Sequence, residues 1–258
     1  MGAVSAARPA DRRGIQSVEI ALRLIQALRT AGGPLLLKDL ARLAQLPTSN
    51  CHRYCVSFVR AGFLKQDPRS GRYDLGPGLL QAGLTALSRL DPVAIGTEAL
   101  ELVVDATGYT GQLTIWADSG PTIVRWMSGR MAVHTSLSIG STLPLLTSAT
   151  GRVFLAYLPS RQTAILAGRE AIAHGGDVSK LAAQVRASGV GQVSGDHIPG
   201  LTAVAAPVLD AFGEAAAVIT LVAVRDGVEP KAVERLRRET REASAKLGWA
   251  PTSVAKAV

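Results

Sequence analysis

The sequence predicts an α+β protein with two unequal parts, and three observations support this prediction. Three helical patterns and a short hairpin fill the first 76 residues. Beyond residue 108, strands of alternating apolar residues are mixed with helices, which favours an antiparallel sheet covered by helices. The charge is also divided, because residues 1–90 hold 13 Lys and Arg against 5 Asp and Glu, whereas residues 91–258 hold 15 of each kind. The whole formal net charge of +8 therefore lies in the first part.

The first part begins with a basic arm, residues 1–13, in which we expect disorder. A helix is predicted over residues 17–30, where Ser17 can cap the N-terminus and apolar residues recur with a period of 3.6. Its inward residues are Val18, Ala21, Leu22, Leu24, Ile25 and Leu28. A second helix covers residues 37–44, and a third runs from a cap at Thr48 or Ser49 to about residue 61. This order predicts a helix-turn-helix.

The third helix has an apolar side and a polar side. The apolar side consists of Cys51, Tyr54, Cys55, Phe58 and Val59. The polar side and the N-terminal end carry hydroxyl, amide, imidazole and guanidinium groups, from Thr48, Ser49, Asn50, His52, Arg53, Ser57 and Arg60. Such mixed donors and acceptors match the base edges in a DNA major groove. The plainer alternative is an ordinary solvated helix face.

A hairpin follows the third helix directly. Strands are predicted over residues 63–66 and 72–75, with a turn over 67–71. Arg69 and Arg72 lie near its tip, where they can reach phosphates or a minor groove. A basic hairpin in this position is typical of a wing, and with the concentrated positive charge it favours nucleic acid as a partner.

The second part alternates between helices and strands. A connecting helix is predicted over residues 78–90, and its apolar positions suit either a core or a subunit interface. The later helices are predicted over residues 93–107, 150–157 and 231–247, with one or two more between 161 and 188. The strands are predicted over residues 111–117, 122–127, 132–138, 203–209 and 216–224.

Several classes of function are disfavoured. No run of 18 uncharged apolar residues is present, and no apolar segment follows the basic arm, so we expect neither a membrane span nor a secretory signal. The two cysteines, Cys51 and Cys55, form no disulfide framework and suit a reducing cytoplasm. With His52 they lack a fourth zinc ligand nearby, and we expect no metal or cofactor. No catalytic motif occurs, and Ser194, Asp196 and His197 are too close in sequence for a catalytic relay, so we expect no enzyme.

Short motifs carry a resemblance to a known family. The stretches Gly14–Val18, Lys38–Ala41, Leu46–Arg53, Gly62–Leu64 and Ser70–Gly76 resemble the DNA-binding domain of IclR-type bacterial transcriptional regulators. Four later stretches are similar to that family's effector-binding domain, which has a GAF-like fold: Gly140–Leu145, Ser148–Arg152, Pro199–Leu201 and Ala205–Asp210. The resemblance covers about residues 14–250. It implies a winged helix-turn-helix over 14–76, a linker helix over 77–92, a GAF-like domain with an antiparallel sheet over 93–250, and a flexible tail over 251–258.

The resemblance also implies partners. It implies a homodimer or homotetramer that binds double-stranded operator DNA and a small-molecule effector. Asn50 and Arg53 are then the candidates for base contacts, and Thr48, Ser49, Arg69 and Arg72 for phosphate contacts. Cys51 and Cys55 stand where the family usually has Val and Leu, which points to packing. The alternative is a DNA-binding architectural protein without an effector.

By position, the family's effector pocket includes Ser148, Ala149, Thr150, Asp196, Ala203 and Thr220. Val193, Ala203 and Val222 stand where some members place Asp, Cys and Ser, so this pocket offers fewer hydrogen bonds to a small anion such as a keto acid. We therefore hypothesise a larger, more apolar and aromatic effector. Its proposed contacts are a wall from Trp116 or Trp126 and a polar anchor from Arg125 or His134, although either Trp suits a core equally well.

Overall fold

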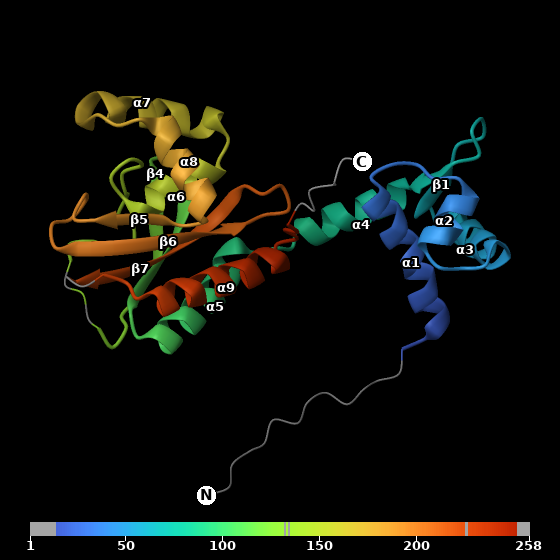
Figure 1. The fold of residues 1–258 in the computed structure, drawn as a ribbon, viewed down its shortest axis with the longest axis horizontal. Helices are drawn as coiled ribbons and strands as arrows, with labels where there is room; N and C mark the ends of the chain where they lie inside the picture. The colour runs from blue at the N-terminus through green and yellow to red at the C-terminus, as the bar shows by residue number, and fades with distance from the viewer. Residues whose placement is uncertain (1–13, 132, 134, 225–226, 252–258) are drawn as a thin grey trace, which may run out of the picture. The chain divides into compact units, whose positions relative to one another are not determined.

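The chain folds into two compact units, Met1–Arg89 and Leu90–Val258. The computed structural model describes residues 14–131, 133, 135–224 and 227–251. Each unit has its own buried core, so we describe each by itself (Figure 1).

The first unit is a winged helix-turn-helix. Its elements are α1 (Gln16–Ala31), α2 (Leu37–Leu43), α3 (Thr48–Arg60), β1 (Leu64–Gln66), β2 (Tyr73–Leu75) and α4 (Pro77–Leu87). The strands form an antiparallel hairpin, and Leu35 makes a further bridge to Tyr73. Leu24, Leu28 and Leu40 pack against both cysteines of α3 in a small core. This packing fixes which side of α3 faces outward.

The caps and some exposed residues of α1 and α3 differ from prediction. Ser17 does not cap α1, because the helix begins one residue earlier and Ile15 is its N-cap, without a side-chain bond. Neither Thr48 nor Ser49 caps α3, because Pro47 occupies that position. Val18 and Leu22 were expected to face inward but are about half exposed, since the buried residues of α1 begin only at Leu24. Val59 of α3 is likewise exposed.

The second unit is an α+β domain built on one antiparallel sheet. The strand order is β4-β3-β7-β6-β5. The strands are β3 (Thr110–Ala117), β4 (Gly120–Met127), β5 (Gly191–Ser194), β6 (Leu201–Leu209) and β7 (Ala215–Val224). The helices are α5 (Pro92–Thr107), α6 (Ala149–Tyr157), α7 (Ser160–His174), α8 (Val178–Ser188) and α9 (Pro230–Lys246). In Figure 1, α5 and α9 cover one face of the sheet and α6 and α8 the other.

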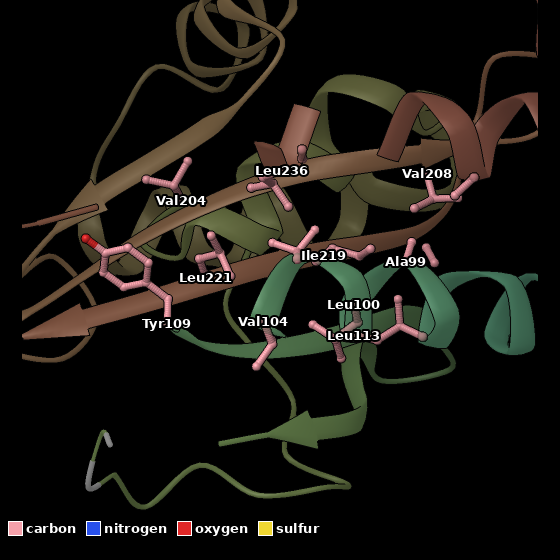
Figure 2. Close-up of a cluster of buried hydrophobic side chains, with 14 of the residues drawn as sticks. Ala99, Leu100, Val104, Tyr109, Leu113, Val204, Val208, Ile219, Leu221 and Leu236 are labelled. Carbon is pink, nitrogen blue, oxygen red and sulfur yellow. The ribbon is translucent and has the colours of Figure 1, made fainter. Parts of the chain in front are cut away.

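The two faces of the sheet carry different side chains because successive residues of a strand point to opposite sides. On the face below α5 and α9, Leu113, Ile219 and Leu221 pack against Leu100 and Leu236, and all five are fully buried (Figure 2). The opposite face carries polar residues within the same strands. The first face is therefore an apolar core, whereas the second combines an apolar core around Phe154 with buried polar groups.

One predicted strand does not form and one strand was not predicted. Residues 133 and 135–138 are not in a strand, and residues 132 and 134 lie outside the described part of the chain. Side chains bind the local backbone there: Leu137 N–H donates to Thr135 Oγ1, and Ser138 N–H donates to Ser141 Oγ. Such local bonds compete with a strand ladder. The missed strand, β5, is only four residues long.

We predict that both cysteines are unreactive in the folded protein. They are fully buried, and burial raises the pKa of both thiols, that of Cys55 to about 12. Because the thiolate is the reactive form, labelling by a disulfide reagent at pH 8 should be at least about a hundredfold slower in buffer than in denaturant. Rapid labelling of one thiol in the native protein would contradict a pure packing role.

Candidate functional site

The outer side of α3 is a row of free polar groups. Thr48, Ser49, Asn50, His52 and Arg53 are all exposed. A surface groove of about 360 Å³ lies along this side, lined by Asn50, Arg53, Tyr54 and Ser57. The hydroxyl of Ser57 donates to the backbone carbonyl of Arg53, and among the described residues no bond engages the Arg53 guanidinium. The helix thus presents amide, guanidinium and hydroxyl groups together.

The wing holds its two arginines differently. The carboxylate of Asp67 accepts from Arg69 N–H and from the Ser70 hydroxyl, and these bonds lower the pKa of Asp67. The Arg72 guanidinium donates to the carbonyl of Pro34 at 3.2 Å and so ties the wing to the loop after α1. Both side chains are exposed, and within the described part of the chain no bond engages the Arg69 guanidinium. Arg69 is therefore the freer cation.

The second unit contains a small cavity between the sheet and the N-terminus of α6. Its volume is about 40 Å³. Five of the predicted effector residues line it: Ser148, Ala149, Thr150, Ala203 and Thr220. Val193 and Val222, which the resemblance also places at this pocket, line it as well.

The first turn of α6 borders this cavity. Amides in the first turn of a helix have no partner within the helix. The Ser148 hydroxyl accepts from Gly151 N–H at 2.9 Å, which leaves the amides of Ala149 and Thr150 for another acceptor. Because a helix N-terminus carries partial positive charge, this end of the cavity suits an anionic group.

A buried polar cluster adjoins these amides. Thr150 Oγ1 and Thr220 Oγ1 are 2.8 Å apart, and Gln112 Nε2 donates to Thr150 Oγ1 at 3.4 Å. Gln112 is 2% exposed, and its Oε1 has no partner among the described residues. Sequence reasoning missed Gln112, although a Gln on the inward side of an apolar strand was a usable signal. It also missed Leu137, Leu143, His197, Ile198 and Leu201.

Two charged side chains hold the loop before α6. Glu170 accepts from the amides of Leu145 and Leu146, both at 2.9 Å. Arg152 Nε donates to the carbonyl of Leu146 at 2.7 Å. A Cβ at position 151 would lie 2.1 Å from the carbonyl oxygen of Pro144, so only glycine allows this close approach. The amides of the first turn are therefore fixed in place.

Three predicted effector residues do not line the cavity. Trp116 packs edge-on against Phe154, 5.7 Å between ring centroids, and lies about 13 Å along β3 from Gln112. Arg125 is exposed and bonds the carbonyl of Val124. Asp196 pairs with Arg152 at 2.7 Å. The alternative wall, Trp126, is also absent from the lining, and His134 lies outside the described residues.

Comparison with known proteins decides the family. Residues 17–68 match the IclR helix-turn-helix domain, and residues 84–249 match the bacterial transcriptional regulator IclR C-terminal domain. The chain belongs to the IclR family. It is therefore a transcriptional regulator with a helix-turn-helix and an effector-binding C-terminal domain. The resemblance read from the motifs is confirmed.

Relatives of this IclR-type regulator cover nearly its whole length. The regulator XynR of Escherichia coli K12 is 26% identical over 250 residues, 92% of this chain and 97% of XynR. The crystal structure of Pseudomonas aeruginosa HmgR has a TM-score of 0.81 and 35% identity, covering 92% of this chain and 100% of that chain. An IclR homologue from Microbacterium hydrocarbonoxydans in complex with 4-hydroxybenzoate has a TM-score of 0.53 and 20% identity, covering 90% of this chain and 99% of that chain.

Other classes of site receive no support from the described residues. No helix there is long and apolar enough to cross a membrane, and no cluster of three His, Cys, Asp or Glu that could bind a metal is found there. Ser194 Oγ lies 3.3 Å from Thr202 Oγ1, and Asp196 is paired with Arg152, so both are engaged away from His197. The named relatives are regulators of transcription, not enzymes.

We predict that His197 makes the stability depend on pH. Its burial lowers the pKa of the imidazole, and the nearby charge of Glu170 offsets this only in part. The folded state thus favours the neutral ring, so its stability falls as the pH drops below the ordinary pKa of about 6.5. Between pH 7.5 and pH 5.5, the free energy of unfolding in urea should fall less for His197→Gln than for the natural chain. Equal losses would mean that the ring stays accessible to solvent.

Proposed function

We propose that α3 reads the operator and that an acid with an apolar, aromatic body binds at the N-terminus of α6 and changes the operator affinity. The observation that carries this proposal is the cavity itself, which has an apolar lining and lies beside the first turn of α6. A carboxylate would accept from the amides of Ala149 and Thr150. The apolar body would contact side chains such as Leu143, Ile198 and Val222.

The chemistry of the walls favours an aromatic acid over a small keto acid. The side chains of Val193, Ala203 and Val222 line the cavity but cannot form hydrogen bonds with a ligand. A keto acid would therefore bind with few partners, whereas a ring would gain from burial of apolar surface. The homologue in complex with 4-hydroxybenzoate is consistent with this class of ligand.

For the DNA-binding unit we propose a division of labour. Asn50 and Arg53, which share the groove on α3, contact base edges. Thr48, Ser49, Arg69 and Arg72 contact phosphates, and His52 and Ser57 complete the surface that faces the duplex. The second candidate function is that of an architectural DNA-binding protein. That function would leave the effector-type second unit without a role.

We further propose that the regulator is a homo-oligomer. The first turns of α1 expose Ile15, Val18 and Leu22, and α4 exposes Leu80 and Leu84. These apolar residues recur at helical spacing, so each helix has an apolar side that the single chain leaves uncovered. A second copy would cover these sides and present a second α3 to a palindromic operator. The number of chains bound per operator tests this.

We predict different consequences for two arginine variants. Arg53→Ala should cost about 1–3 kcal/mol on the preferred operator and relax base preference, whereas Arg69→Ala should weaken all duplexes alike and reduce the salt slope by about one. The measurement is titration of the chain's own upstream intergenic DNA and a scrambled duplex at two salt concentrations. Lys246→Ala, in the second unit, is the control. Equal, sequence-independent losses from both arginine variants would remove the division of labour.

We predict that aromatic acids stabilise the protein. Benzoate and 4-hydroxybenzoate at saturating concentration should raise the melting temperature by several degrees, because ligand at about 100 times Kd adds about 2.7 kcal/mol. Pyruvate and glyoxylate should have little effect. Ala203→Val, which fills part of the cavity, should abolish the shift while retaining DNA binding. Stabilisation by the keto acids alone would exclude the proposed effector class.

A further inference from the structure

The effector cavity is too small in this state for the ligand that its walls favour. About 40 Å³ holds two or three water molecules, so an aromatic acid requires one wall to move. The sheet and α6 are regular elements whose backbone bonds resist movement. The loop 139–143 is bound to β4 by Gly140 N–H, which donates to the carbonyl of Ile123, and by Leu143 N–H, which donates to that of Pro121. The moving wall must be sought elsewhere.

The loop 195–200 is a wall whose described attachments to the rest of the unit are few. It contributes His197 and Ile198 to the lining. Its backbone bonds are local, because Gly195 N–H donates to the carbonyl of Leu201 and Leu201 N–H donates to that of Ile198. Gly195 and Gly200, at its two ends, have φ angles of 77° and 81° and no neighbouring atom within 4 Å of an added Cβ. Glycines in open space at both ends suit a hinged segment.

Among the residues that the structure describes, one ion pair links this loop to the rest of the unit. Arg152 Nη2 lies 2.7 Å from Asp196 Oδ2. The other guanidinium nitrogens are already engaged, because Nε donates to the carbonyl of Leu146 and Nη1 to that of Gln192. The Arg152 side chain is 17% exposed and that of Asp196 41%. Arg152 is therefore the fixed half of the pair, and Asp196 is the half that can leave.

We propose that residues 195–200 form a lid over the effector cavity and that the Arg152–Asp196 pair is its latch. This inference rests on the proposed function of the cavity as the effector site. Arg152 is two residues beyond Thr150 on α6, so the latch joins the lid to the helix whose first turn binds the acid. Asp196 acts as a positioning residue: it does not touch the ligand, but it sets how often the cavity opens for ligand to enter or leave.

Amide hydrogen exchange of the ligand-free, full-length protein tests the latch. In Asp196→Asn, the amides of Gly195 and Leu201 should exchange about three- to tenfold faster, because a partly exposed, charge-assisted contact is lost. Asp196→Glu keeps the charge and should restore most of the protection. Glu234→Gln breaks a comparable pair with Arg237, 2.6 Å long and outside the cavity lining, and should leave both amides unchanged.

Two outcomes would overturn the proposal. Unchanged exchange at Gly195 and Leu201 in Asp196→Asn would show that the pair does not hold the loop. Equal acceleration in the strands and in α6 would show that Asp196 supports the fold as a whole.

Ligand kinetics separate the lid from the effector assignment. With benzoate as the probe, Asp196→Asn should raise the association and dissociation rate constants together and change Kd by less than about twofold, since the latch is outside the contact surface. A Kd that rises tenfold at unchanged association rate would make Asp196 a ligand contact and refute the latch. If benzoate binds neither protein, the aromatic effector fails, and the exchange measurement still decides the lid.

Discussion

Both faces of the five-stranded sheet are buried, and this constraint decides where the second unit can hold a ligand. Below α5 and α9 the strands supply aliphatic side chains that are buried in one core. Below α6 the same strands supply Gln112, Thr220 and Ala203, which are polar or small. Since successive side chains alternate between the faces, one strand can build a core and a site at once. The second face also has a buried core, around Phe154 and Val218, and the cavity lies beside it, where residues of the strands are small or polar.

The position of α6 on that face depends on one close approach. Gly151 allows the first turn to lie against the carbonyl of Pro144, and Glu170 and Arg152 bind the backbone of the same loop. The hydrogen bonds with Glu170 and Arg152 each satisfy a backbone N–H or C=O group that would otherwise be buried without a partner. The loop is therefore rigid without being part of a helix or strand. This rigidity holds the first turn of α6 in place beside the cavity.

Much of the fold could be predicted because helices and paired strands repeat their apolar residues over many positions, as in α3 and β7. The failures have local causes. The strand expected at 132–138 gives way to side-chain bonds such as that between Ser138 and Ser141, which periodicity does not register. Trp116 and Arg125 were chosen for their chemistry, but their position on the sheet decides their contacts, and the packing of β3 against Phe154 of α6 is a long-range property. Gln112 was missed because its neighbours in space come from α6 and β7.

The charge of the cavity limits how an acid can be recognised. Among the described residues its lining contains no Lys or Arg, and the nearby Arg152 is neutralised by Asp196. The lining histidine, His197, has a lowered pKa and is neutral at pH 7. A carboxylate therefore relies on helix amides, worth about 0.3–2 kcal/mol. Burial of an aromatic ring, at about 25 cal/mol per Å² over some 150 Å², contributes about 4 kcal/mol. Most of the binding free energy of an aromatic acid must then come from burial of its apolar ring, and its carboxylate mainly orients the ligand.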